Sequence, residues 1–168
     1  MAESGETTIE VSVKALVLDE RTHVPVVMLK EKDGERMLPI WIGPAEASAI
    51  AIALEDMEPQ RPLTHDLLLS IIEGLRATVQ KVVVTEIRDS TFYARIFIRG
   101  EGGIAAVDAR PSDSVALALR AKAPIFVASA VFEQHGSTPE EPGPEDRAQA
   151  LRDHLRNLDL KDFGKLEG

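Results

Sequence analysis

Cysteine is absent from this chain of 168 residues. Its absence excludes disulfides, thiolate metal sites and cysteine nucleophiles, and it fits a reducing compartment. Long apolar runs are missing as well: the longest, residues 47–54, ends at Glu55 and falls far short of the roughly 20 residues that a membrane span needs. Residues 1–8 are acidic and polar, unlike a signal peptide. The sequence therefore predicts a cytoplasmic protein with no membrane partner.

An excess of basic residues is also lacking. The net charge is −9, of which residues 1–10 carry −3 and residues 133–168 carry −4, so the part between them is close to neutral. A nucleic-acid-binding protein usually has a basic excess or stripe, although net charge does not exclude a local basic patch. No Walker loop, G-x-G-x-x-G, G-x-S-x-G or H-E-x-x-H motif is present either. Electrostatics alone thus gives weak support to nucleic acid as a partner.

The length and the changes in composition predict one domain with tails. We expect a disordered N-terminus over residues 1–8 and a folded domain over residues 9–133. Residues 134–144 are rich in proline, glycine and acidic residues, which is typical of a linker. Residues 145–168 are acidic, and leucines spaced by four and three predict an amphipathic helix near their start.

Within the domain, the apolar patterns predict an α+β fold, in which helices pack on a mixed, largely antiparallel sheet. The first three strands form an antiparallel meander, because Asp33-Gly34 is a strong hairpin signal between the second and the third. The predicted strands are residues 9–18, 24–30, 36–42, 78–88, 91–99, 104–109 and 124–127. The predicted helices are residues 44–56, 64–76 and 111–122, with one further helical turn at 129–134.

The densest polar group lies where the strand 104–109 meets the helix that starts at Pro111. Asp108, Arg110, Ser112 and Asp113 all fall at this corner. One interpretation is structural: a strand end, a buried Arg–Asp pair and a favourable acid at the helix dipole. The other is functional, because a helix N-terminus beside an arginine binds phosphate, and two carboxylates can hold a divalent metal.

A second polar group lies at another helix start. Arg61 precedes Thr64, which looks like an N-cap, and His65 and Asp66 follow in the first turn. Asp66 favours the helix dipole and His65 is exposed in the structural interpretation; in the functional one His65 is a general base or a metal ligand. Glu46, near the start of the first helix, either stabilises that helix or supplies a third carboxylate to the same corner.

Several of these segments together resemble the bifunctional nuclease domain family, in that family's order, across about residues 9–133. They are residues 38–43 (Leu-Pro-Ile-Trp-Ile-Gly) with 46–47 (Glu-Ala), residues 61–67 (Arg-Pro-Leu-Thr-His-Asp-Leu), residues 91–94 (Thr-Phe-Tyr-Ala), residues 108–114 (Asp-Ala-Arg-Pro-Ser-Asp-Ser) and residues 123–125 (Ala-Pro-Ile). The resemblance implies an α+β domain that associates as a homodimer. It also implies a nuclease that acts on both DNA and RNA.

Two hypotheses follow. In the first, the protein is a metal-assisted phosphodiesterase. Asp108 and Asp113, with Glu46 or Asp66, bind Mg²⁺ or Mn²⁺, His65 activates water, and Arg61, Arg110 and Ser112 bind the substrate. In the second, the protein is a non-enzymatic dimeric binding or regulatory module, whose polar corner is structural or binds a small anion. The first gains if the helix starts at residues 44, 64 and 111 converge on one pocket.

Overall fold

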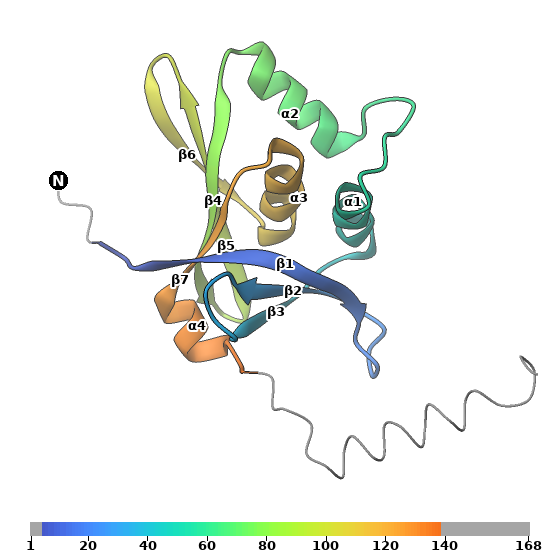
Figure 1. Cartoon of the computed structure of the whole chain (residues 1–168), viewed down its shortest axis with the longest axis vertical. Helices are drawn as coiled ribbons and strands as arrows, with labels where there is room; N and C mark the ends of the chain where they lie inside the picture. Colours follow the sequence, from blue (N-terminus) through green and yellow to red (C-terminus); the bar gives the residue numbers. More distant parts are fainter. Residues whose placement is uncertain (1–4, 139–168) are drawn as a thin grey trace, which may run out of the picture. The chain divides into compact units, whose positions relative to one another are not determined.

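Seven strands form one mixed sheet in the computed structural model, which describes residues 5–138 (Figure 1). The strand order is β3-β2-β1-β7-β4-β5-β6, and every neighbouring pair is antiparallel except β4 and β7. The strands are β1 (Thr8–Leu18), β2 (Pro25–Glu31), β3 (Met37–Trp41), β4 (Thr78–Arg88), β5 (Thr91–Gly100), β6 (Gly103–Ala109) and β7 (Ile125–Ala128). The predicted α+β class with a largely antiparallel sheet is confirmed.

Connections between neighbouring antiparallel strands set the register of much of the sheet. The predicted meander of β1, β2 and β3 is present, with Val27 opposite both Leu16 and Ile40. Between β4 and β5, Asp89 and Ser90 both have positive φ, at 48° and 61°. Two such residues form the type I′ turn that matches the twist of a hairpin.

Four helices complete the domain: α1 (Pro44–Leu54), α2 (Thr64–Gly74), α3 (Pro111–Ala121) and α4 (Ser129–His135). Figure 1 shows α3 between α1 and α2 on one side of the sheet, and α3 contacts both of these helices and β4. We call this side the helix face. The short α4 follows β7 and contacts β3, β4 and β7.

The core lies between the helix face of the sheet and α3. Strand residues alternate between two faces, and the buried members of β4 and β5, such as Val82 and Ala94, point toward the helices. Helix α3 buries Val115, Ala116, Leu117 and Ala118 against them. Because α3 is buried on most sides, its first turn is held rigidly beside the neighbouring helices.

The structure corrects three details of the sequence interpretation. Strand β1 begins at Thr8, paired with Ala128, so the domain starts within the segment that was expected to be disordered. At the other end, Ser137 pairs with Met37, so the domain extends past residue 133 into the expected linker. Helix α2 has Leu63, not Thr64, at its N-cap. The predicted helix near residue 145 lies outside the described residues.

Among residues 5–138, no helix is both long and apolar enough to cross a membrane.

Shortening a buried side chain of α3 should weaken the whole domain. Leu117 is fully buried, so Leu117→Ala is expected to lower the free energy of unfolding by about 2–5 kcal/mol, measured by urea denaturation. Leu75→Ala is the matched control, because Leu75 is 75% exposed and its loss should change the value by less than about 0.5 kcal/mol. Equal losses in the free energy of unfolding from the two substitutions would contradict the assignment of Leu117 to the core.

Candidate active site at three helix starts

The first turn of α3 carries the centre of the polar cluster. Arg110 is the N-cap residue in an extended conformation, and Pro111 takes the first helical position, where a missing N–H does no harm. The hydroxyl of Ser114 donates a hydrogen bond to the carbonyl of Arg110 at 3.0 Å, which fixes the turn. Asp113 therefore projects from the first turn, where the helix dipole favours its charge.

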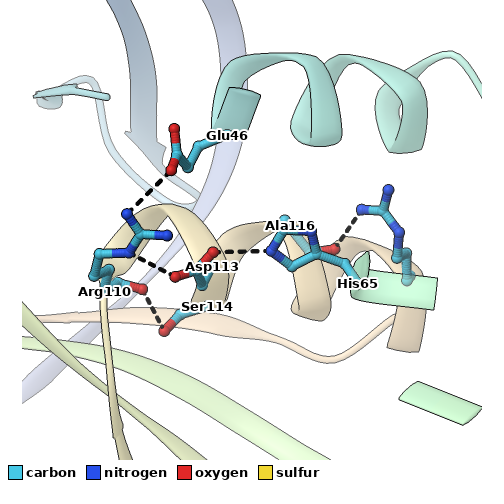
Figure 2. A network of polar contacts seen from close by, with 7 residues as sticks. Glu46, His65, Arg110, Asp113, Ser114 and Ala116 are labelled. Carbon is cyan, nitrogen blue, oxygen red and sulfur yellow. Dashed lines mark hydrogen bonds and ion pairs between the residues drawn. The ribbon is translucent and has the colours of Figure 1, made fainter. Parts of the chain in front are cut away.

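Asp113 links α3 to α2. One carboxylate oxygen lies 2.9 Å from Nε2 of His65, and the other accepts a hydrogen bond from Nε of Arg110 at 2.7 Å (Figure 2). Burial acts to raise the pKa of Asp113, but the hydrogen bonds from Arg110 and His65 outweigh it, so this pKa is lowered from its ordinary value. The carboxylate is therefore held in its ionised form between a guanidinium and an imidazole.

Arg110 extends the cluster to α1. One terminal nitrogen of Arg110 lies 3.0 Å from the carboxylate of Glu46, in the first turn of that helix (Figure 2). The hydrogen bond from Arg110 to Asp113, followed by the charges of Asp113 and Glu46, raises the pKa of Arg110. The side chain is 65% exposed, so it presents a permanent positive charge to solvent while two carboxylates hold it in place.

A second ion pair, which the sequence analysis missed, holds α2 against α3. Nε of Arg120, whose side chain is 7% exposed, lies 2.8 Å from the carboxylate of Asp66. That carboxylate also accepts the N–H of Leu63 at 2.9 Å and so caps α2. Burial acts to raise the pKa of Asp66, but these two hydrogen bonds outweigh it and the pKa is lowered. Seven residues separate Asp113 from Arg120, which places both on one face of α3, and this spacing was the available signal.

The cluster lines a hollow on the helix face. Its volume is about 300 Å³, and its lining includes Glu46, Thr64, His65, Arg110 and Asp113 from the starts of all three helices. The helix starts at residues 44, 64 and 111 thus converge. A neighbouring hollow of about 270 Å³ shares Glu46 and Arg110, and adds Ser112 and the turn between β4 and β5.

His65 lies deeper than the sequence suggested. The structural interpretation placed it on the surface, but the residue is only 9% exposed. Its Nε2 faces Asp113, and its Nδ1 has no hydrogen-bond partner within residues 5–138. An imidazole that is oriented by a carboxylate on one nitrogen can exchange a proton through the other.

Two of the expected site residues lie apart from this cluster. Asp108 is directly opposite Arg95 on β5, so its exposed side chain points to the face of the sheet away from the helices. Asp113 lies on the helix face, and the two carboxylates do not meet. Arg61 is exposed, and among the described residues it forms no ion pair.

The metal ligand set expected from Asp108, Asp113 and Asp66 is therefore not assembled. Asp66 is paired with Arg120, and Asp108 is on the other face. Across residues 5–138, no three histidine, aspartate or glutamate side chains come together to hold a metal ion. Glu46 and Asp113 do approach one another, but the guanidinium of Arg110 binds both of them. These two carboxylates therefore fit the guanidinium of Arg110 better than they fit Mg²⁺ or Mn²⁺.

Comparison with known proteins places the sequence beside one family. A family model described as the bifunctional nuclease domain matches residues 27–140. An uncharacterized protein of Mycobacterium tuberculosis (strain ATCC 25618 / H37Rv) is 42% identical over 145 residues, which are 86% of each chain.

Plant relatives are more distant and longer. Bifunctional nuclease 1 of Oryza sativa subsp. japonica is 25% identical over 131 residues, which are 76% of this chain and 40% of that protein. Bifunctional nuclease 1 of Arabidopsis thaliana is 27% identical over 107 residues, 61% of this chain and 33% of that protein. The chain thus spans less than half the length of these plant relatives.

The lowered pKa of Asp113 predicts an acid-sensitive contribution to stability. Because the ionised form is favoured in the folded state, the contribution is complete above the ordinary pKa of 3.8 and is lost as the pH falls through the lower folded-state value. At neutral pH, Asp113→Asn should lower the free energy of unfolding by about 1–3 kcal/mol, since partners of the charge are left unpaired. In urea denaturation the difference from wild type should shrink toward zero below the ordinary pKa.

Asp108→Asn is the control, because Asp108 is exposed and forms no ion pair among the described residues. It should follow the wild-type profile at each pH. A constant difference between Asp113→Asn and wild type at every pH would contradict the assignment.

Proposed function

Because the chain belongs to the bifunctional nuclease domain family, we propose that it hydrolyses phosphodiester bonds of DNA and RNA at the helix-start site. The observation that carries the proposal is the convergence of α1, α2 and α3 on one polar hollow that contains an oriented histidine. The plant relatives that bear the name nuclease support the reaction class. The site geometry supports the roles of the residues.

In this proposal His65 is the general base. Asp113 holds Nε2, so the imidazole accepts a proton from the attacking water at Nδ1. The proton makes the ring an imidazolium, and the adjacent ionised carboxylate stabilises that charge. As the water oxygen bonds to phosphorus, the P–O bond to the leaving nucleoside oxygen breaks, and that oxygen takes a proton from solvent. Asp113 is therefore a positioning residue, and its lowered pKa keeps it in the ionised form that this role requires.

Arg110 and the start of α3 would bind the scissile phosphate. The guanidinium is exposed on one side and anchored to Glu46 and Asp113 on the other, so it is already oriented when a phosphate arrives. The backbone N–H groups of the first turn of a helix have no intrahelical acceptor, and those of Ser112 and Asp113 belong to the turn whose Asp113 carboxylate binds this guanidinium. Together they supply hydrogen-bond donors where a phosphoryl oxygen gains charge.

A second candidate is binding without catalysis. It is favoured by the internal neutralisation of the site, in which both carboxylates are satisfied by Arg110 and His65. A module of this kind would hold a small anion on Arg110 and leave it unchanged. Cleavage measurements separate the two candidates directly.

His65→Gln tests the proposed reaction. The amide can still reach Asp113 but cannot take a proton, so cleavage of labelled single-stranded DNA and RNA should fall by about 100-fold or more. His135→Gln is the matched control and should cleave at the wild-type rate, since His135 is exposed in the last turn of α4 and lines neither hollow. The assay is run with added Mg²⁺ or Mn²⁺ and with a chelator, which reports directly on any metal requirement.

Wild-type cleavage by His65→Gln would overturn the role of His65. Tight binding of phosphate by a wild-type protein that cleaves neither substrate would favour the second candidate.

We also propose that the domain forms a homodimer through β6. This strand ends the sheet, so one of its edges is unpaired within residues 5–138. Natural edge strands are usually protected by lysine, proline or a bulge, but Asp108 is the only charged residue of β6. Ile104 and Val107 are exposed on it, and pairing of two copies would cover both strands in one symmetric interface.

A lysine in the edge strand should prevent this pairing. Val107→Lys is expected to convert the dimer to a monomer in sedimentation velocity, because like charges would meet across the two-fold axis. Val24→Lys is the control, since Val24 is similarly exposed but lies outside β6. A wild-type monomer, or a dimer that survives Val107→Lys, would contradict the proposal.

A further inference from the structure

The face of the sheet opposite α1, α2 and α3 carries a second group of functional side chains. We call it the outer face. Residues directly opposite one another in paired strands share a face, and the register places Lys81 with Phe97, Val83 with Arg95, and Val83 with Phe126. None of these side chains belongs to the core cluster between sheet and helices. The same alternation that directs Val82 and Ala94 inward therefore directs this set outward.

Aromatic rings lie next to basic side chains on the outer face. Nζ of Lys81 lies 4.9 Å from the ring centre of Phe97 and 5.8 Å from that of Phe126. The guanidinium of Arg88 lies 4.5 Å from the ring centre of Tyr93. All three rings are half-buried, so each keeps part of its surface accessible. Lys81 and Arg88 thus lie where a nucleic-acid base would stack on these rings.

Basic side chains outnumber acidic ones on strands β4, β5 and β6 of the outer face. Across β4 and β5, Lys81, Arg88, Arg95 and Arg99 provide four positive charges, and Glu86 and Asp108 provide the two nearest negative ones on β4 and β6. Glu86 pairs with Arg88, whereas Arg95 is exposed and forms no ion pair within the described residues. A hollow of about 550 Å³ lies here, and its lining includes Lys81, Arg95 and Phe97 together with Glu6 and Glu86.

We infer that the outer face binds single-stranded nucleic acid, with bases on the rings of Phe97, Phe126 and Tyr93 and phosphates on the neighbouring basic side chains. Rings on an open sheet reach only bases that are free of a duplex, and every base offers a flat face, so this recognition is tolerant of sequence. When a base stacks on Phe97, the ammonium of Lys81 moves to the flanking phosphate.

A nucleic-acid strand bound to the outer face has a short route to the helix-start site. This part of the inference rests on the proposed function. Arg88 and Tyr93 lie next to the turn between β4 and β5. Ser90 and Thr91 of that turn line the same hollow as Arg110 and Ser112. A nucleic-acid strand that passes from the outer face over this turn therefore reaches Arg110, whose guanidinium is proposed to hold the scissile phosphate. The outer face would position the strand, and the helix face would cut it.

Binding is measured apart from cleavage. Fluorescence anisotropy with labelled oligo(dT) and oligo(U) of about 16 nucleotides gives the Kd of the full-length chain in the His65→Gln background. Phe97→Ala should raise the Kd roughly tenfold through lost stacking. Arg95→Ala should raise it and also reduce the slope of log Kd against log salt, because one phosphate contact is lost. Arg21→Ala is the matched control at an exposed turn and should change neither.

The outcomes decide the inference independently of catalysis. Unchanged binding by both Phe97→Ala and Arg95→Ala would overturn it, even if the wild type cleaves both substrates. Tighter binding of a duplex of equal length would also overturn it, as would loss of dimerisation by Phe97→Ala, which would make the face an interface between copies. If His65→Gln and wild type both fail to cleave but bind the oligonucleotides through Phe97 and Arg95, the outer face stands and the proposed reaction does not. Because Arg95 is exposed, Arg95→Ala tests the inference even if Phe97→Ala fails to fold.

Discussion

The carboxylate of Asp113 is the contact on which the arrangement of this site depends. It bonds His65 of α2 through one oxygen and Arg110, at the start of α3, through the other, and Arg110 in turn reaches Glu46 of α1. A buried imidazole and an exposed guanidinium are thus held by one ionised group. The rigid first turn of α3 places that group, because the rest of the helix is fixed in the core.

Strand alternation explains why the chemistry divides between two faces. Asp108 and Asp113 are five residues apart, yet one follows the outward direction of β6 and the other projects from a helix that begins after the chain has turned. Spacing along the sequence suggested a shared carboxylate site. The β6–α3 corner separates the two carboxylates, and Asp113 finds its partners in His65 of α2 and in Arg110 at the start of its own helix.

The elements were largely predictable from the sequence, while the long-range pairings were not. Turn residues at 33–34 and 89–90 and apolar periodicity fix strands and helices locally, so their bounds agree with the structure to within about three residues. Burial of His65 and the pairing of Asp66 with Arg120 depend on how α2 packs on α3. The spacing of Asp113 and Arg120 indicates that both lie on one face of α3, but it does not identify the partner of Arg120. The sequence indicates that the enzyme hypothesis requires the three helix starts to converge, but only the tertiary structure shows that they do.

Net charge was the weakest guide to function, and the sheet shows the physical reason. A sum over the chain weighs every ionised group equally, whereas a bound phosphate feels mainly the groups within about a Debye length, roughly 8–10 Å. On the outer face the alternation of β4 and β5 gathers Lys81, Arg88 and Arg95 beside half-buried aromatic rings. An acidic chain can therefore carry a locally basic, aromatic surface, because pairing between strands, not composition, decides which charges become neighbours.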